Sequence, residues 1–199
     1  MTSQFWWHLS RSSGIVAWLM LTGSVLLGVV LASDLFPRWR SRPWLTSTHR
    51  WLAVLTLCFL GLHLGSLLGD AYLRLGALDY LLPFHSVWRP TAVAAGVIAV
   101  WLLLAVQVSA YAAKRLSRRW WRDIHLCSYW VFWAVSVHAA LAGTDAARPL
   151  YVVSALVVLA AVVAAISYRI FTRSLPRRRR ADLVDRHQTA ADRPPTAAR

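Results

Sequence analysis

The stretch that decides the fold is HRWLAVLTLCFLGLH, which runs from His49 to His63. It is an apolar segment with a histidine at each end, and these two histidines are fourteen residues apart. A second apolar stretch repeats the arrangement between His125 and His138, which are thirteen residues apart. Because ionisable side chains inside apolar segments are costly and mark functional positions, these four histidines are the leading candidates for a site.

The composition is that of a membrane protein. Of the 199 residues, 58% are hydrophobic and 15% are charged, which is too apolar for a soluble domain of this size. The net charge of +14 would suit a nucleic-acid-binding protein, but the basic residues lie in loops between apolar spans, so we expect no nucleic-acid partner. Cys58 and Cys127 both lie inside spans and form no C-x-x-C motif, and we expect buried, unreactive thiols.

Five windows contain no Asp, Glu, Lys or Arg and are long enough to cross a bilayer as helices. They are Gly14–Ala32, Trp51–Gly69, Thr91–Ala113, Ile124–Thr144 and Leu150–Tyr168. A spanning segment must satisfy its backbone hydrogen bonds internally, so each window is predicted to be helical. The sequence therefore predicts an all-α membrane protein with a five-helix transmembrane bundle. The first window is expected to be an anchor and not a cleaved signal, because basic residues follow it.

Basic residues are distributed unequally over the two sides of the predicted bundle. One side holds eighteen of them, whereas the other holds only Arg11, Arg74, Arg89 and Arg148. The positive-inside rule therefore predicts that the N-terminus is outside and the C-terminus cytoplasmic. The arginine-rich composition without glutamate suggests a bacterium, so we expect a multi-pass protein of the bacterial cytoplasmic membrane, in contact with lipid.

Three regions are expected along the chain. Residues 1–13 form an external N-terminal segment, residues 14–170 form the membrane domain, and residues 171–199 form a cytoplasmic tail. The tail is rich in Arg, Pro, Asp and Thr, which predicts disorder and contact with anionic lipid. The connection over residues 71–88 is predicted to be external and amphipathic, lying along the membrane surface.

The four histidines are expected at two depths of the membrane. The second and fourth spans run in the same direction, so His49 and His125 lie near the cytoplasmic edge, while His63 and His138 lie toward the outer leaflet. The two levels are about 20 Å apart along a helix. Two axial imidazoles hold a haem iron without an open coordination position, which suits transfer of single electrons. The pattern therefore predicts two haems, one above the other, between two helices.

An alternative interpretation is that the histidines are polar residues satisfied by neighbouring helices. The spacing also raises a geometric difficulty for the haem hypothesis. Fourteen residues return to within about 40° of the same helix face, whereas thirteen end about 140° away from it. The fourth span must therefore bend or twist if both of its histidines are to face the second span.

These patterns resemble the ferric reductase-like transmembrane domain family, which includes ferric reductases, NADPH oxidases and the haem-binding membrane subunit of methionine sulfoxide reductase. The resemblance rests on H-x13-H and H-x12-H on two co-directional spans and covers about residues 5 to 170. Shorter motifs add to it at the starts of the spans: Leu9–Gly14, His49–Arg50, Trp88–Pro90 and Trp121–His125. The family resemblance implies two b-type haems, an inner one on His49 and His125 and an outer one on His63 and His138.

The sequence departs from the family pattern in two respects. Many members have a helix before the first one found here, and the reductases and oxidases carry a cytoplasmic flavin and nicotinamide domain. The tail contains no G-x-G-x-x-G motif. We therefore expect a five-helix bacterial form without a flavin domain, which receives its electrons from a separate donor.

Arginines near the ends of the spans are candidates for binding the haem propionates. Arg11 and Arg89 are expected at the external ends of the first and third spans, near the outer haem, where a charge-assisted pair is favourable. Arg50 and Arg122 have corresponding positions near the inner haem. All four can instead be ordinary juxtamembrane arginines.

Other residues are weaker candidates. Phe132 and Trp133 lie midway between His125 and His138, so either can lie between the haems or pack in the core or against lipid. His8 and His85 are expected outside, where they can bind a metal or help an acceptor dock, but a third ligand is missing. His187, in the tail, is expected to be solvated.

From the sequence we expect a di-haem protein that transfers electrons from a cytoplasmic flavoprotein or a quinol to an extracytoplasmic acceptor. No catalytic residue is assigned, because the sequence contains no nucleophile–base pair, paired carboxylate or phosphate loop. Whether the chain is an oxidoreductase or the membrane subunit of one stays open. The alternative is a haem-free transporter or assembly factor whose histidines make structural or proton-relay contacts.

Overall fold

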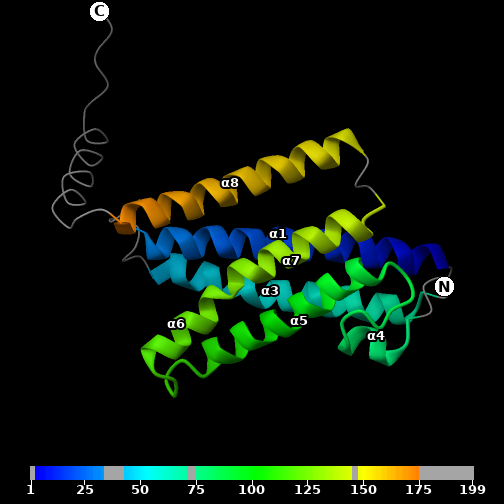
Figure 1. Cartoon of the computed structure of the whole chain (residues 1–199), viewed down its shortest axis with the longest axis horizontal. Helices are drawn as coiled ribbons and strands as arrows, with labels where there is room; N and C mark the ends of the chain where they lie inside the picture. The colour runs from blue at the N-terminus through cyan, green and yellow to red at the C-terminus, as the bar shows by residue number, and fades with distance from the viewer. Residues whose placement is uncertain (1–2, 34–42, 71–74, 145–147, 175–199) are drawn as a thin grey trace, which may run out of the picture.

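The computed structural model describes residues 3–33, 43–70, 75–144 and 148–174 (Figure 1). Within these ranges the chain is helical and contains no strand. The helices are α1 (Ser3–Ala32), α3 (Pro43–Leu68), α4 (Ala77–Leu81), α5 (Pro90–Tyr111), α6 (Arg118–Leu126), α7 (Ser128–Ala142) and α8 (Pro149–Ser174).

Five helical segments are long and apolar enough to cross a membrane. They correspond to α1, α3, α5, the combined length of α6 and α7, and α8, which confirms the predicted all-α architecture with five spans. The first helix begins earlier than its apolar window, at Ser3, so most of the expected N-terminal segment continues α1. The side of the membrane on which each terminus lies stays a prediction. Most of the expected tail lies outside the described residues, and His187 is part of it.

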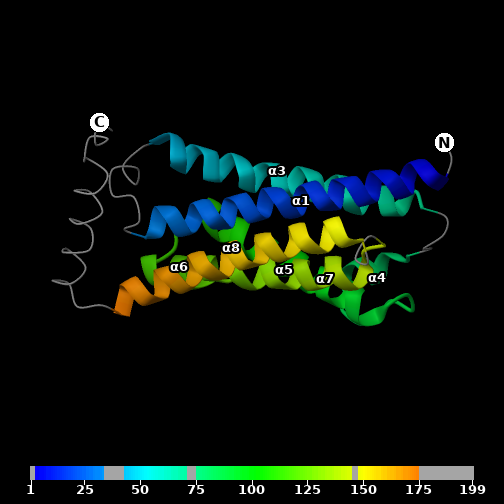
Figure 2. The same cartoon turned by 90° about the horizontal axis from the view of Figure 1, so that it is seen from above.

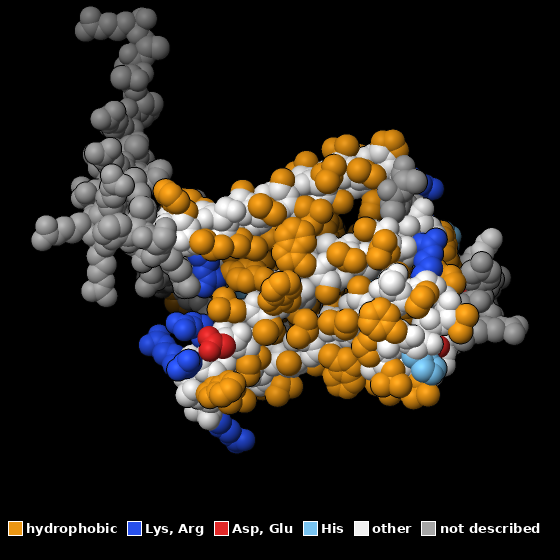
Figure 3. All heavy atoms as spheres, in the orientation of Figure 1, with side chains coloured by type: hydrophobic (Ala, Val, Ile, Leu, Met, Phe, Trp, Pro, Cys, Tyr) orange, Lys and Arg blue, Asp and Glu red, His pale blue; other side chains and the backbone are white. Residues whose placement is uncertain are grey.

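The flanks of the bundle are apolar, as a lipid environment requires. On α8, for example, Leu150 is 83% exposed and Val157 is 63% exposed. Exposed apolar surface of this extent is unfavourable in water and favourable in hydrocarbon. Figure 3 shows hydrophobic side chains along the flank and basic side chains gathered at the end of the bundle where α6 lies.

The sequence prediction for the thiols was wrong in part, because Cys58 is exposed on α3, while Cys127 is half-buried.

Four of the five spans form two packed helix pairs, and α8 contacts α1. Helix α1 packs along α3 and runs antiparallel to it, and α5 packs in the same way along α7 (Figures 1 and 2). Among the described helices, α3 packs extensively only against α1. The two pairs meet where α1 also contacts α7. Each pair therefore contains one of the two helical segments that carry histidines.

The core lies in the middle of the bundle. Phe132 on α7 is fully buried, and its ring stacks on that of Trp18 on α1, with centroids 6.5 Å apart and planes at 17°. The indole N–H of Trp18 donates a hydrogen bond to Ser136 Oγ at 3.0 Å. Trp133, by contrast, is 37% exposed. Of the two aromatic candidates between the histidine levels, Phe132 is therefore the one in the core.

The fourth span is interrupted at Cys127, between α6 and α7. The backbone N–H of Cys127 bonds to the carbonyl of Ile124, three residues back, at 3.0 Å. Such a bond belongs to a tighter turn than the regular α-helix and changes the rotation of the residues that follow. His125 and His138 thus lie on different helices, in agreement with the bend or twist that the thirteen-residue spacing requires.

Candidate functional site

The structure brings the four histidines together as two facing pairs. The imidazole of His49 on α3 lies opposite that of His125 on α6, with ring centroids 6.1 Å apart and planes at 68°. The imidazole of His63 on α3 lies opposite that of His138 on α7, with centroids 6.3 Å apart and planes at 81°. These are the pairs that the family resemblance implied.

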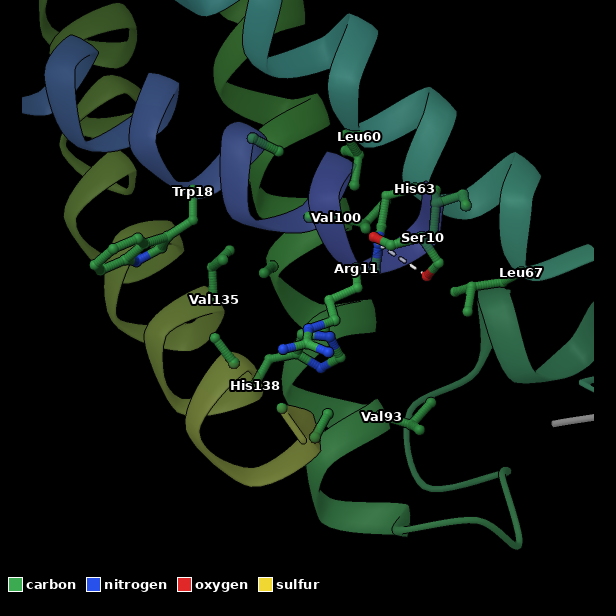
Figure 4. A pocket seen from close by; sticks show the side chains of 18 of the residues that line it. Ser10, Arg11, Trp18, Leu60, His63, Leu67, Val93, Val100, Val135 and His138 are labelled. Carbon is green, nitrogen blue, oxygen red and sulfur yellow. Dashed lines mark hydrogen bonds between the residues drawn. The ribbon is translucent and has the colours of Figure 1, made fainter. Parts of the chain in front are cut away.

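Helix α1 orients His63. The ring nitrogen Nδ1 of His63 lies 2.8 Å from the backbone carbonyl oxygen of Ser10 and 3.4 Å from its hydroxyl (Figure 4). A carbonyl can only accept a hydrogen bond, so Nδ1 carries the proton and Nε2 has a free lone pair. The ring fits closely beside Gly14, where an added Cβ would lie 3.0 Å from Nδ1.

The same helix, α1, also orients His49, at the other of the two histidine levels. Its Nδ1 lies 2.9 Å from the carbonyl oxygen of Ser24 and 3.1 Å from the Ser24 hydroxyl. An added Cβ at Gly28 would lie 3.5 Å from the ring. The tautomer of His49 is therefore fixed in the same way as that of His63, with Nε2 available to a metal.

Helix α5 orients His138. Its Nδ1 donates to the carbonyl of Ala92 at 2.7 Å, and the ring lies against Gly96, where an added Cβ would be 2.8 Å from Nδ1. His138 thus has the same arrangement as the two histidines of α3, but the carbonyl and the glycine come from α5.

His125 is held differently. Its ring stacks on the indole of Trp121, one turn earlier on α6, with centroids 5.2 Å apart and planes at 17°. Its Nδ1 is buried and has no hydrogen-bond partner among the described residues. The stacking fixes the plane of the ring, whereas no described carbonyl fixes its tautomer.

A cavity of about 320 Å³ adjoins the His63–His138 pair and extends toward the middle of the bundle (Figure 4). Both imidazoles and the guanidinium-bearing side chain of Arg11 line it. Most of its other walls are aliphatic or aromatic, including Trp18, Leu60 and Val135. An enclosure of this kind suits a large apolar cofactor with a few polar contacts.

The histidine pairs fit the axial ligands of a haem. An imidazole nitrogen binds a metal at about 2 Å and lies about 1 Å from the ring centre, so two rings on opposite sides of one iron have centroids about 6 Å apart. Both observed separations agree with this value. In the described part of the chain, no three His, Cys, Asp or Glu side chains gather into a metal site. A pair of ligands suits a metal whose other ligands come from a macrocycle.

The arginines expected at the propionates have different environments. Arg11 lines the cavity and stacks over Trp7, with its guanidinium carbon 4.8 Å from the ring centroid. Arg89 stacks over Trp88 and donates to the carbonyl of Leu141 at the end of α7. Arg11 is therefore the better placed of the two for a ligand in the cavity.

The corresponding arginines near His49 and His125 lie at the surface. Arg50 is exposed, and Arg122 is exposed beside Asp123, with Nε 3.6 Å from the carboxylate. Sequence reasoning missed a better placed cation, Arg169 of α8, which is half-buried and donates to the hydroxyl of Tyr129 on α7. Its signal in the sequence is its position directly after Tyr168, at the end of the fifth apolar window.

Sequence reasoning also missed the supporting residues on α1. Ser10 and Ser24 are fourteen residues apart, and so are Gly14 and Gly28. This is the spacing of His49 and His63 on the antiparallel neighbour. A search for that spacing in every span would have found both pairs.

The external histidines are not part of the site. His85 contacts Asp79, with Nδ1 2.8 Å from the carboxylate oxygen, and the carboxylate also accepts the backbone N–H of Gly76. His8 is exposed, and its ring lies against Trp7. Neither belongs to a three-ligand cluster in the described residues.

Comparison with known proteins places this arrangement in a family. The family model described as "Ferric reductase like transmembrane component" matches residues 13–142, which is more than half of the chain and includes all four paired histidines. No curated protein and no solved structure matches the chain. Since the family model matches more than half of the chain and the matched region holds both facing pairs, the chain belongs to the family of ferric reductase like transmembrane components.

Proposed function

We propose that this protein binds two b-type haems, one between His49 and His125 and one between His63 and His138, and passes electrons across the membrane. Family membership already indicates electron transfer in a membrane. The observation that carries the di-haem proposal is the separation of the rings, 6.1 and 6.3 Å, in two pairs at two levels of one bundle. Haem iron with two imidazole ligands supplies one-electron redox chemistry.

The chain's own residues would hold, orient and insulate the cofactors. The carbonyls of Ser10, Ser24 and Ala92 keep three histidines in the tautomer that presents Nε2. The apolar walls exclude water and lower the local dielectric constant. Between the two levels, the stacked rings of Trp18 and Phe132 fill the core. No open coordination position is provided for a substrate, so the acceptor would be reduced at the protein surface without binding to iron.

We infer that electrons enter at the His49–His125 level and leave at the His63–His138 level. The first level lies at the end of the bundle where α6 presents its arginines, and the positive-inside rule makes this the cytoplasmic end. We therefore use "inner" for the His49–His125 pair and "outer" for the His63–His138 pair. A flavoprotein or a quinol is the donor, and an extracytoplasmic molecule is the acceptor.

A haem-free membrane protein remains the alternative, and one observation favours it. Three of the four histidines have a carbonyl partner for Nδ1, so a structural role would leave few polar groups unsatisfied. That role does not require the rings to face each other in pairs, whereas iron ligation does.

The test is the haem content of the purified chain, measured as a pyridine haemochrome together with electron paramagnetic resonance of the oxidised protein. We expect two b-type haems per chain and low-spin signals of strong anisotropy, because the imidazole planes are far from parallel, at 68° and 81°. No haem in protein produced with ample haem supply would reject the proposal.

Substitution of single ligands assigns the two sites. His63→Ala is expected to remove one of the two low-spin signals, and His49→Ala the other, because each substitution takes one axial ligand from one pair. His8→Ala serves as the control, since that ring is exposed and contacts only the neighbouring Trp7 in the described structure. If His63→Ala left both signals unchanged, the ligand assignment would be wrong.

A further inference from the structure

Three of the four histidines are held by one repeated arrangement. In each case Nδ1 approaches the backbone carbonyl of a residue on the neighbouring helix, and a glycine follows that residue by four positions. The carbonyl and glycine are Ser10 and Gly14 for His63, Ser24 and Gly28 for His49, and Ala92 and Gly96 for His138. Helices α1 and α5, which pack against the histidine-bearing helices α3 and α7, thus use the same arrangement.

Helix geometry explains why a glycine follows each carbonyl by four positions. The carbonyl of one residue accepts the N–H of the residue four positions later, so these two residues lie one above the other on the same face. The carbonyl oxygen has a second lone pair, but a side chain on the later residue crowds the approach to it. A glycine at that position leaves room for an imidazole to donate to the same oxygen.

We propose that Gly14, Gly28 and Gly96 are positioning residues for the haem ligands. Each opens a helical carbonyl to one histidine, and that hydrogen bond orients the ring so that Nε2 faces the opposite histidine. This inference rests on the proposed function, because the quantity that the glycines control is the orientation of an axial ligand. His125 has no such arrangement. In the outer pair both histidines therefore have a carbonyl partner beside a glycine, whereas in the inner pair only His49 has one.

The three glycines differ in how closely the ring approaches. An added Cβ would lie 2.8 Å from the His138 ring at Gly96, 3.0 Å from the His63 ring at Gly14, and 3.5 Å from the His49 ring at Gly28. The first distance forces a shift, the second is tight, and the third is an ordinary contact. Alanine is therefore expected to displace His138 most, His63 less and His49 hardly at all.

The chain provides matched controls. Gly61 and Gly65 lie on α3 beside His63, and a Cβ added at either would meet no atom within 4 Å. Alanine there changes the same residue type in the same helix as the ligands, without contact to an imidazole. Since alanine forms helices better than glycine, neither control is expected to weaken its helix.

The experiment compares haem content, low-spin resonance and reduction potentials of full-length wild type, Gly96→Ala, Gly14→Ala, Gly28→Ala, Gly61→Ala and Gly65→Ala. We expect Gly96→Ala to shift or abolish the outer signal while the inner signal stays as in wild type. Gly14→Ala should shift the same signal by a smaller amount. Gly28→Ala and both controls should match wild type, whereas the larger Gly28→Val should shift the inner signal alone.

Wild-type signals and potentials in both Gly96→Ala and Gly14→Ala would overturn the inference, as would equal shifts in Gly61→Ala. If Gly96→Ala does not accumulate, Gly14→Ala decides, because it contacts the opposite ligand of the same pair with less overlap. A haem-free wild type would reject the proposed function instead. The glycine arrangement is then tested on the full chain by the ¹⁵N resonances of histidine, where Gly96→Ala must move the Nδ1 signal of His138.

Discussion

At the level of single residues, the site depends on which nitrogen of each imidazole carries the proton. Backbone carbonyls decide this for His49, His63 and His138. A hydrogen bond from Nδ1 to a carbonyl also makes the opposite nitrogen a stronger electron donor toward a metal. His125 has only the stacked ring of Trp121. The two histidines of the inner pair are therefore held in chemically unequal ways, whereas those of the outer pair are held alike.

Arg169 is the residue whose role is most open to a direct test. Its side chain is half-buried, and its guanidinium donates to the hydroxyl of Tyr129 and lies near the Tyr129 ring, with its carbon 5.9 Å from the centroid. A cation at this depth is costly unless it is paired, and a haem propionate is a suitable partner. We expect Arg169→Leu to lower occupancy of the inner haem and Arg169→Lys to preserve most of it, as measured by haem content and resonance.

Arg50 provides the control for this prediction, because it has the same charge near the same pair but is exposed, whereas Arg169 is half-buried. Arg50→Leu should leave the inner haem unchanged. Equal loss in the leucine variants of Arg50 and Arg169 would show that only general charge at this end of the bundle matters.

At the level of helices, the turn at Cys127 is what allows two histidines thirteen residues apart to serve the same neighbouring helix. Sequence reasoning detected the need for a bend, because the angle between positions 125 and 138 follows from helix geometry alone. It could not locate the bend, since neither Cys127 nor Ser128 is a helix breaker and no Gly or Pro stands nearby. The position of the turn depends on packing between spans, which one sequence does not display.

Inserting one alanine between Ser128 and Tyr129 tests this view. The insertion gives the regular spacing of fourteen, yet it rotates everything after it by about 100° relative to α6. We expect loss of the outer haem and retention of the inner one, seen by haem content and resonance. Retention of both haems would show that α7 can adjust its rotation freely. The same insertion after Lys114, in the connection between α5 and α6, is the control for lengthening the chain.

The short helix α4 and its flanking loop depend on the carboxylate of Asp79. The hydrogen bonds from His85 and from the backbone N–H of Gly76 lower the pKa of Asp79 below its ordinary value of 3.8. A carboxyl with a lowered pKa stabilises the folded loop above its ordinary titration range, and this contribution is lost as the pH falls through the lowered value.

We therefore expect the amide of Gly76 to stay protected from hydrogen exchange from neutral pH down to about pH 4, and to lose protection below it. The measurement is amide exchange corrected for its intrinsic pH dependence. Asp79→Ala should remove the protection at every pH, while Asp123→Ala, on the exposed face of α6, should not affect it. Loss of protection already well above about pH 4 would contradict this role of the Asp79 carboxylate.

At the level of the whole molecule, composition and charge distribution were sufficient to predict the architecture. Five apolar windows in the sequence became five spans, because a bilayer leaves helices as the only solution for such segments. The partners of the histidines were less accessible to sequence reasoning. They are backbone carbonyls, such as those of Ser10 and Ala92, and every residue carries one, so only the glycines beside them leave a trace in the sequence.

The orientation of the bundle is a prediction of the whole charge distribution. The basic cluster on α6 and the arginine-rich tail predict that the His49–His125 pair lies at the cytoplasmic side. We expect a fluorescent reporter fused to the C-terminus to be active and an alkaline phosphatase fused there to be inactive. Replacing Arg118, Arg119 and Arg122 by glutamine should weaken this bias. An active phosphatase in the wild-type fusion would reverse the proposed direction of electron flow.

The separation of α3 from α7 has a consequence for how the protein is made. Each helix pair is an antiparallel hairpin, with α1 beside α3 and α5 beside α7. We expect each hairpin to insert into the membrane by itself. If the chain binds haem as proposed, the haems would be the main link between the histidine-bearing helices, so we expect cofactor loading to be the last step of biogenesis. Cells starved of haem should accumulate a chain that is fully inserted but easily cut by proteases.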